Sequence, residues 1–257
     1  MNAIGRLGKS ARWRTDGLRA YARAYRATAG WHRTQRVPVD LPGGDRLPVI
    51  FCTWHRLERL PQTLAMLAAQ DVPVQVLIWN NSPDRAVVDK AVAGAVIPVA
   101  VHHCDRNIGG FGRFYLARAA AEAGHGRVVF IDDDLDFGPD AARALARACG
   151  QRMVVSRWAW CIRGRYGDRD RAGAGEPAHY AGTCGMAADA SVFTLPAVFR
   201  CPRRFWFAED LWLSGFAARN RYLVAGAEAD ITEVADGRNQ NDSLGWVKQR
   251  LWRGIER

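Results

Sequence analysis

The chain has 257 residues, of which 49% are hydrophobic and 24% charged, the balance of an ordinary globular protein. Its formal net charge is +10, and most of the excess lies in residues 1–36, which carry nine Lys or Arg against one acid, Asp16. The rest of the chain is close to neutral, which argues against a nucleic-acid-binding core. Six widely spaced cysteines lack the close pairs of zinc or redox motifs and predict a reduced, cytoplasmic protein.

The N-terminal segment predicts a basic amphipathic helix. Over residues 10–29, Leu, Ala and Tyr side chains share one face and arginines share another. Such a helix either lies on an anionic membrane surface, here the cytoplasmic face, or packs on its own domain with a solvated arginine face. We expect no secretory signal and no spanning segment, because the longest apolar stretch, residues 91–101, is about half of the roughly 20 residues required.

From residue 47 onward, short apolar runs typical of strands alternate with segments of helical periodicity. Strands are predicted over residues 47–53, 74–79, 97–101 and 127–131, with helices over about 57–67, 86–92 and 114–123. This alternation predicts an α/β fold with a mainly parallel central sheet, helices on both faces and right-handed crossovers.

Polar residues cluster where each predicted strand ends. The four clusters are Thr53–Arg56, Asn80–Ser82, Asp105–Asn107 and Asp132–Asp134. Ligands of open α/β sheets bind at the carboxyl ends of the strands, so we expect the clusters to meet at one edge of the sheet.

The triplet Asp132, Asp133 and Asp134 is the most informative cluster. Two unit charges about 4 Å apart repel by roughly 4 kcal/mol at an effective dielectric of 20, so adjacent carboxylates call for a compensating cation, such as a divalent metal. The alternative is that Asp134, Asp136 and Asp140 are turn and capping residues before a helix over residues 141–147.

Five short motifs, in order along the chain, resemble those of family 2 glycosyltransferases of the GT-A fold. They are Val49–Arg56, Val76–Asp84, Asn107–Arg113, Phe130–Asp134, which resembles the DXD motif, and Phe207–Leu213, which resembles the Glu-Asp motif. The resemblance covers roughly residues 47–240. It implies that residues 1–45 are the basic segment and linker, 46–138 the nucleotide-sugar half, 139–240 the acceptor half and 241–257 a basic tail.

The resemblance implies metal-dependent, inverting transfer of a hexosyl group from a nucleotide sugar to an acceptor hydroxyl. Mg²⁺ or Mn²⁺ would neutralise the diphosphate leaving group. Asp134 would bind the metal directly, with Asp132 reaching the ribose or a metal-bound water and Asp133 orienting the donor sugar. Alternation along an extended segment predicts that Asp132 and Asp134 face together and Asp133 points away.

Inversion requires a general base opposite the leaving group. By motif position Asp210 is that base and Glu209 orients the acceptor or the base. The alternative is that both acids merely favour the N-terminus of a following helix over residues 211–218 through its dipole.

The remaining site residues follow from motif position. Thr53, Asn80 and Asn81 would hold the base and ribose, Arg106 and Arg113 could contact the phosphates, and Trp206 could stack on the acceptor sugar. The complete set for nucleotide-sugar binding is Thr53, Arg56, Asn80, Asn81, Asn107, Arg113, Asp132 and Asp133.

The leading hypothesis is therefore an enzyme of surface-glycan or lipid-linked saccharide synthesis at the cytoplasmic membrane face. Nucleotidyl transfer is an alternative, although no glycine- and lysine-rich phosphate loop follows the first strand. A catalytically silent sugar- or nucleotide-binding module is another. A dinucleotide site at Gly109–Gly112 is not expected, because the full GxGxxG pattern is lacking.

Overall fold

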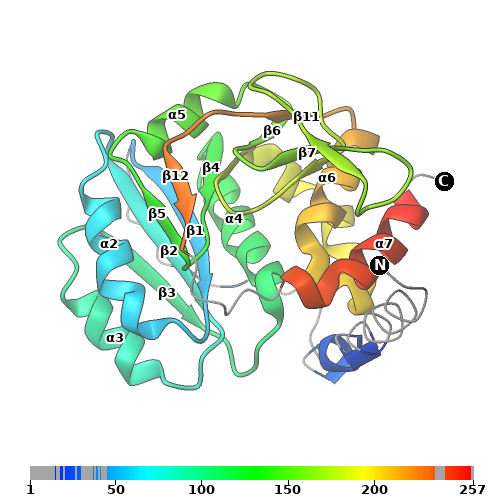
Figure 1. Ribbon diagram of the computed structural model, residues 1–257. Helices are drawn as coiled ribbons and strands as arrows, with labels where there is room; N and C mark the ends of the chain where they lie inside the picture. The colour runs from blue at the N-terminus through cyan, green and yellow to red at the C-terminus, as the bar shows by residue number, and fades with distance from the viewer. Residues whose placement is uncertain are drawn as a thin grey trace.

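The computed structural model describes residues 15, 18–19, 21–26, 28–29, 37, 39, 41, 45–234 and 241–255. Its centre is a seven-stranded sheet in the order β11-β6-β10-β4-β1-β2-β3 (Figure 1). Every pairing is parallel except those of β10 with β4 and β6. The expected mainly parallel sheet is confirmed. The strands are β1 Leu47–Thr53, β2 Val74–Asn80, β3 Val99–His103, β4 Arg127–Phe130, β6 Met153–Ser156, β10 Met186–Asp189 and β11 Leu223–Gly226.

The first four strands lie within two residues of their predicted positions, and the largest shift has a chemical cause. β3 begins at Val99 rather than at residue 97. Pro98 has no backbone N–H to donate to a ladder, although its carbonyl still accepts from the N–H of Val76 at 2.9 Å.

Side chains that alternate along β1 define the two faces of the sheet. Val49 and Phe51 pack into one apolar cluster, whereas Ile50 belongs to a second cluster on the opposite face. The first is covered by α2 Leu60–Ala68, α3 Arg85–Ala93 and α5 Ala141–Ala148. The second is covered by α4 Gly112–Glu122, α6 Glu209–Arg219 and α7 Asn241–Ile255. Helices therefore cover both faces, as expected, and Figure 1 shows α2 and α3 on the opposite side of the molecule from α6 and α7.

The second half of the chain adds two small sheets. β5 Leu135–Phe137 pairs with β12 Ile231–Glu233, and β7 Ala159–Ile162 lies between β8 Arg169–Arg171 and β9 Tyr180–Ala181. The 3-10 turn η5, Arg203–Ala208, leads directly into α6. These elements place the second half of the chain beside the carboxyl ends of the long strands.

Described residues of the N-terminal segment are helical at 15, 18–19 and 21–26 and pack on the domain. The ring of Tyr21 lies 5.9 Å from that of Phe205 and 5.2 Å from that of Trp246, and Ala24 is fully buried. Of the two alternatives left by the sequence, packing on the domain is thus observed. In the described part of the chain, no helix is long and apolar enough to cross a bilayer.

The segment expected as a basic tail is helical instead over Asn241–Ile255. Its buried residues Leu244, Val247 and Leu251 recur at helical spacing and contact α6 and η5. This helix carries a residue of the candidate site.

Candidate active site

A cavity of about 570 Å³ lies where the carboxyl ends of β1, β2 and β4 meet the start of α6. Side chains that follow the strands form one side, and residues from β9, α6 and α7 form the other. Those on the strand side are Thr53, Trp54, His55, Arg56, Asn81, Asn107, Arg113 and Asp132–Asp134; those opposite include Tyr180, Phe207, Glu209, Asp210 and Lys248. The predicted convergence of strand ends is therefore observed for β1, β2 and β4 and, through Asn107, for the loop that follows β3.

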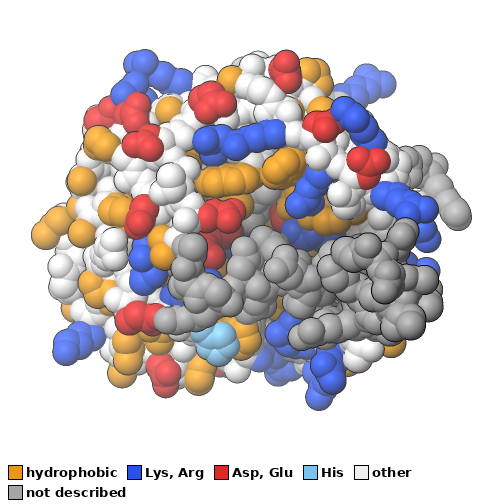
Figure 2. Space-filling view, in the orientation of Figure 1, with side chains coloured by type: hydrophobic (Ala, Val, Ile, Leu, Met, Phe, Trp, Pro, Cys, Tyr) orange, Lys and Arg blue, Asp and Glu red, His pale blue; other side chains and the backbone are white. Residues whose placement is uncertain are grey.

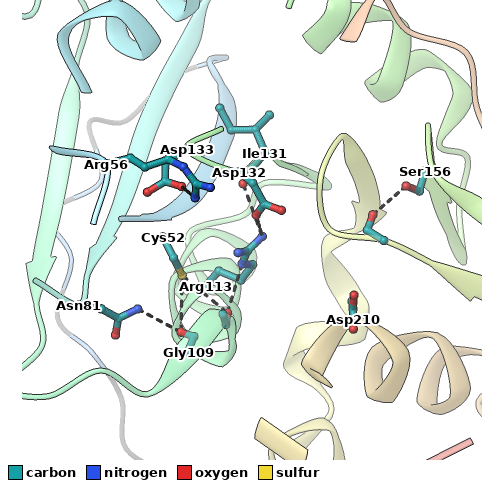
Figure 3. Close-up of polar contacts among 12 residues, drawn as sticks. Cys52, Arg56, Asn81, Gly109, Arg113, Ile131, Asp132, Asp133, Ser156 and Asp210 are labelled. Carbon is teal, nitrogen blue, oxygen red and sulfur yellow. Dashed lines mark hydrogen bonds and ion pairs between the residues drawn. The ribbon is translucent and has the colours of Figure 1, made fainter. Parts of the chain in front are cut away.

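Two arginines neutralise part of the aspartate triplet (Figure 3). Arg113 Nη1 lies 2.8 Å from Asp132 Oδ1, and Arg56 lies 3.5 Å from Asp133 Oδ1 and 3.4 Å from Asp134 Oδ2. Burial and the neighbouring charge of Asp132 nonetheless raise the pKa of Asp133 to about 6 and that of Asp134 to about 7. The cluster therefore retains an excess of negative charge.

The expected alternation within the triplet is wrong. All three aspartates line the cavity, and Arg56 contacts both Asp133 and Asp134. The chain turns at Asp133 and Asp134 instead of continuing as a strand, so side chains need not point to alternate sides. Asp133 consequently lines the cavity together with Asp132 and Asp134.

Arg113 is fixed in place by its surroundings. Its side chain is 6% exposed, and its Nε donates to the carbonyl of Gly110 at 3.2 Å. Burial opposes its charge, but Asp132 outweighs this and raises the pKa of Arg113 well above its ordinary value. Gly110 in turn packs so closely on the Glu209 carboxylate that an added side chain would collide with it. These contacts join the two sides of the cavity.

Thr53 is a buried polar residue without a satisfied hydroxyl. It is 1% exposed, lines the cavity, and its Oγ1 has no hydrogen-bond partner among the described residues. Leaving such a group unsatisfied costs about 1–3 kcal/mol, which a ligand hydrogen bond would recover. Thr53 therefore suits the nucleotide-binding role expected for it.

The asparagines of the motifs form mostly internal contacts. Asn81 Oδ1 accepts from Trp79 Nε1 and from the N–H of Ile108, each at 3.1 Å, and its Nδ2 donates to the carbonyl of Gly109 at 3.2 Å. Asn107 Oδ1 accepts from the N–H of Gly109 at 2.7 Å. Both residues line the cavity and fix the loop around Gly109.

Three residues expected at the site lie elsewhere. Asn80 is fully buried outside the cavity lining, with its Nδ2 2.8 Å from His103 Nδ1. Trp206 is fully buried, stacked on Phe111 at 4.4 Å, and so has no face for an acceptor sugar. Arg106 donates to the carbonyl of Ala29 at 2.6 Å and does not line the cavity.

Lys248 is the site residue that the sequence did not reveal. Its Nζ lies 2.8 Å from Asp210 Oδ2 and 3.0 Å from the hydroxyl oxygen of Tyr180, which itself donates to Asp210 Oδ2. The N–H of Leu211 donates to Asp210 Oδ1 at 2.7 Å. Every side chain in this group is nearly fully buried. The only sequence signal was the helical spacing of the apolar residues around position 248.

The adjacent carboxylates Glu209 and Asp210 differ in acidity. Burial opposes the charge of Asp210, but Lys248 and Tyr180 outweigh it and lower the pKa of Asp210 below its ordinary value. Burial and the charge of Asp210 raise the pKa of Glu209 to about 7. Asp210 is therefore ionised throughout the neutral range, whereas Glu209 changes its charge within it.

Among the described residues, no group of three or more His, Cys, Asp or Glu side chains is arranged to hold a metal ion. The residues still fit a hard divalent cation, because Mg²⁺ is usually held by one or two carboxylates together with substrate phosphates. Asp132 and Asp134 offer such oxygens, and a cation would offset the burial and the Asp132 charge that together raise the pKa of Asp134.

No family model and no curated protein matches the sequence. Solved structures do match. A 1–349 fragment of S. aureus TarS in complex with UDP superposes with a TM-score of 0.52 at 17% identity, over 74% of this chain and 60% of that one. The mannosyltransferase PcManGT from Pyrobaculum calidifontis, in complex with GDP-Man and Mn²⁺, gives 0.54 at 16% identity, over 98% of this chain and 75% of that one. The chain thus spans about 60% of the TarS fragment, and its fold is the GT-A-like α/β fold of these glycosyltransferases.

Replacing Lys248 by Met should lower the free energy of unfolding by about 3 kcal/mol at pH 7, because Asp210 would remain buried without its cation. The lowered pKa of Asp210 stabilises the wild type above the ordinary value of 3.8, and this contribution is lost as the pH falls through the lowered value. In the variant that pKa rises, so the deficit should narrow on acidification to about pH 3.5. Urea denaturation at both pH values measures the difference.

The matched control is Lys90→Met on the exposed surface of α3. An equally small effect at both positions would show that the buried pair contributes no stability. The double variant Lys248→Met/Asp210→Asn should recover part of the loss.

Proposed function

We propose that the protein transfers a hexosyl group from a nucleoside diphosphate sugar to an acceptor hydroxyl with inversion. The observation that carries the proposal is the layout of one cavity, with the aspartate triplet and its arginines on one side and Glu209–Asp210 on the other. The fold shared with TarS, solved with UDP, and with PcManGT, solved with GDP-Man and Mn²⁺, supports it.

The strand side of the cavity suits the donor. The unsatisfied hydroxyl of Thr53 can bond the base or ribose, and the guanidinium groups of Arg56 and Arg113 can approach the diphosphate. Asp133 lines the same space and can accept hydrogen bonds from hydroxyls of the donor sugar. This assigns the donor to residues that the structure places together.

A divalent cation completes the charge balance. When all three carboxylates are ionised, they face only two guanidinium groups, and the cluster carries one negative charge in excess before a diphosphate enters. Asp134 and Asp132 would hold Mn²⁺ or Mg²⁺, which supplies neutralisation of the charge that develops on the departing diphosphate. In Figure 2 acidic side chains gather near the middle of the face, with basic and hydrophobic ones around them.

The opposite side suits activation of the acceptor. The acceptor oxygen bonds to the anomeric carbon as the bond from that carbon to the diphosphate oxygen breaks, and the hydroxyl proton passes to Asp210. Lys248 and Tyr180 hold the Asp210 carboxylate ionised and oriented, and Glu209 adds a second carboxylate beside it. Attack from the side away from the leaving group inverts the anomeric centre.

We also propose that the N-terminal helix places the enzyme on the cytoplasmic face of an anionic membrane, where it would meet a glycan or lipid-linked acceptor. Tyr21 and Ala24 face the domain, whereas Leu18, Ala22 and Tyr25 form an exposed stripe at helical spacing, with Leu18 60% and Tyr25 45% exposed. Exposed arginines at 19 and 26 lie next to this stripe. An apolar stripe bordered by arginines is the pattern of helices that lie on membranes.

Replacing Asp134 by Ala should lower Mn²⁺-dependent release of nucleoside diphosphate from UDP-glucose or GDP-mannose by at least about 100-fold. The control is Asp136→Ala, which removes a carboxylate that pairs with Arg59 at 2.7 Å and does not line the cavity. Unchanged turnover in the first variant would exclude Asp134 as a ligand. Release of pyrophosphate would favour nucleotidyl transfer, and tight donor binding without turnover would favour a silent module.

If ionised Glu209 assists transfer, the rate should fall about tenfold per pH unit below 7, because the pKa of Glu209 lies at about 7. Glu209→Gln should lower the rate and abolish this fall of the rate below pH 7, whereas the exposed control Glu228→Gln should retain it. The rates are measured at saturating Mn²⁺, which would hold Asp134 ionised, so that titration of Asp134 does not contribute to the pH dependence of the rate. A fall that persists in Glu209→Gln would assign the titration to another group.

Changing Leu18 to Glu should weaken sedimentation with phosphatidylglycerol vesicles at least about tenfold, because the apolar stripe would carry charge. Val96→Glu is the control, since Val96 is 88% exposed elsewhere on the surface. Phosphatidylcholine vesicles should bind less of the wild type. Equal binding by all three proteins would exclude the stripe as the contact.

A further inference from the structure

A second, smaller hollow of about 270 Å³ adjoins the active-site cavity. We call it the aromatic hollow, because Trp158, Trp160 and Tyr166 form much of its wall. Tyr180 and Cys184 line both spaces, and no residue of the aspartate triplet lines this one. It is thus a separate compartment beside the catalytic carboxylates, at about the lower end of the roughly 300–1,000 Å³ range of small-ligand pockets.

The aromatic side chains are held in place by a guanidinium group. Arg169 lies over three rings, at 4.9 Å from Trp160, 4.5 Å from Tyr166 and 5.9 Å from Tyr180. Such contacts contribute about 0.5–2 kcal/mol each. Trp158 and Trp160 are only partly buried, so part of each indole remains accessible.

Polar groups of both kinds accompany the rings. Arg169 Nη1 is buried and has no hydrogen-bond partner among the described residues. The exposed carboxylate of Glu233, on β12, lies at the same hollow. A ligand with hydroxyl oxygens would satisfy the unpaired N–H and could donate to the carboxylate.

We propose that the aromatic hollow binds an uncharged sugar ring of the acceptor. The C–H face of a pyranose can pack on an indole ring, and its hydroxyls can bond to Arg169 and Glu233. The two charged side chains that line the hollow, Arg169 and Glu233, have opposite signs, so the lining itself has no net charge to attract an anionic sugar. This inference rests on the proposed function, because it names the class of molecule that receives the transferred sugar.

Tyr180 gives the hollow a role in positioning the acceptor. Its ring forms part of the wall, while its hydroxyl donates to Asp210. A sugar in the aromatic hollow would therefore be separated from Asp210, the proposed base, by the side chain of Tyr180. A hydroxyl group of the same acceptor could then reach the active-site cavity.

Binding can be tested without turnover. Saturation-transfer NMR with the methyl glycosides of glucose, galactose, mannose and N-acetylglucosamine should show at least one ligand, with an affinity that falls at least about tenfold in Trp160→Ala and in Arg169→Ala. Trp160→Phe, which keeps a ring, should retain most of it. Arg163→Ala is the control, since Arg163 is 69% exposed and pairs with Asp170 outside the hollow.

A second control separates the hollow from the donor side. Asp132→Ala alters the donor cavity and should leave glycoside binding unchanged. Binding lost in Asp132→Ala but kept in Trp160→Ala, or no binding of any glycoside, would overturn the proposal. Glycoside binding in the hollow together with no release of nucleoside diphosphate from any donor would refute the transfer function and leave the sugar site standing.

Discussion

The buried ion pair between Asp210 and Lys248 is the interaction on which the second half of this site depends. Their side chains are 11% and 3% exposed, so both charges are largely removed from water. Desolvation of such a pair can exceed its Coulombic gain, and the pair is tolerated only when other hydrogen bonds satisfy it. Tyr180 and the N–H of Leu211 provide these bonds. One carboxylate thereby joins α6, α7 and β9 in a fixed arrangement.

The carboxylates on the two sides of the cavity differ in how far the protein itself compensates their charge. On the α6 side, Lys248 keeps Asp210 ionised without any ligand. On the strand side, burial and the neighbouring charge of Asp132 raise the pKa of Asp133 and Asp134, although Arg56 and Arg113 lie beside the triplet. The first side is complete in the protein alone, whereas in the proposed reaction a cation and phosphate groups would complete the second.

The sequence predicted those features that depend on local patterns. Apolar runs located the first four strands to within two residues, and the rule for strand ends brought Thr53, Asn81 and the aspartate triplet into one cavity. The later strands of the central sheet, β6, β10 and β11, were not predicted. The sequence prediction failed where a side chain's position depends on tertiary contacts. Trp206 stacks on Phe111 in the core, and Asn80 forms a hydrogen bond to His103 outside the cavity. Neither contact has a sequence signature.

Lys248 was missed for a related reason. It lies 38 residues after Asp210, and a lysine in a basic segment is usually solvated. Only the packing of α7 under α6 buries it, and that packing follows from the helical spacing of Leu244, Val247 and Leu251. This spacing is typical of a helix, but it does not indicate which charged side chain of the helix turns inward.

The N-terminal helix is linked to the same structure. Tyr21 packs on Trp246 of α7, two residues before Lys248, and Arg23 lies 5.4 Å from the ring of Phe207, which lines the cavity. Removing the whole segment would therefore uncover α7 and Phe207 as well as abolish any membrane contact. Within the outward stripe, the ring of Tyr25 lies 5.0 Å from Arg203 of the domain, whereas Leu18 is 60% exposed. A substitution at Leu18 therefore separates attachment to a surface from support of the active site.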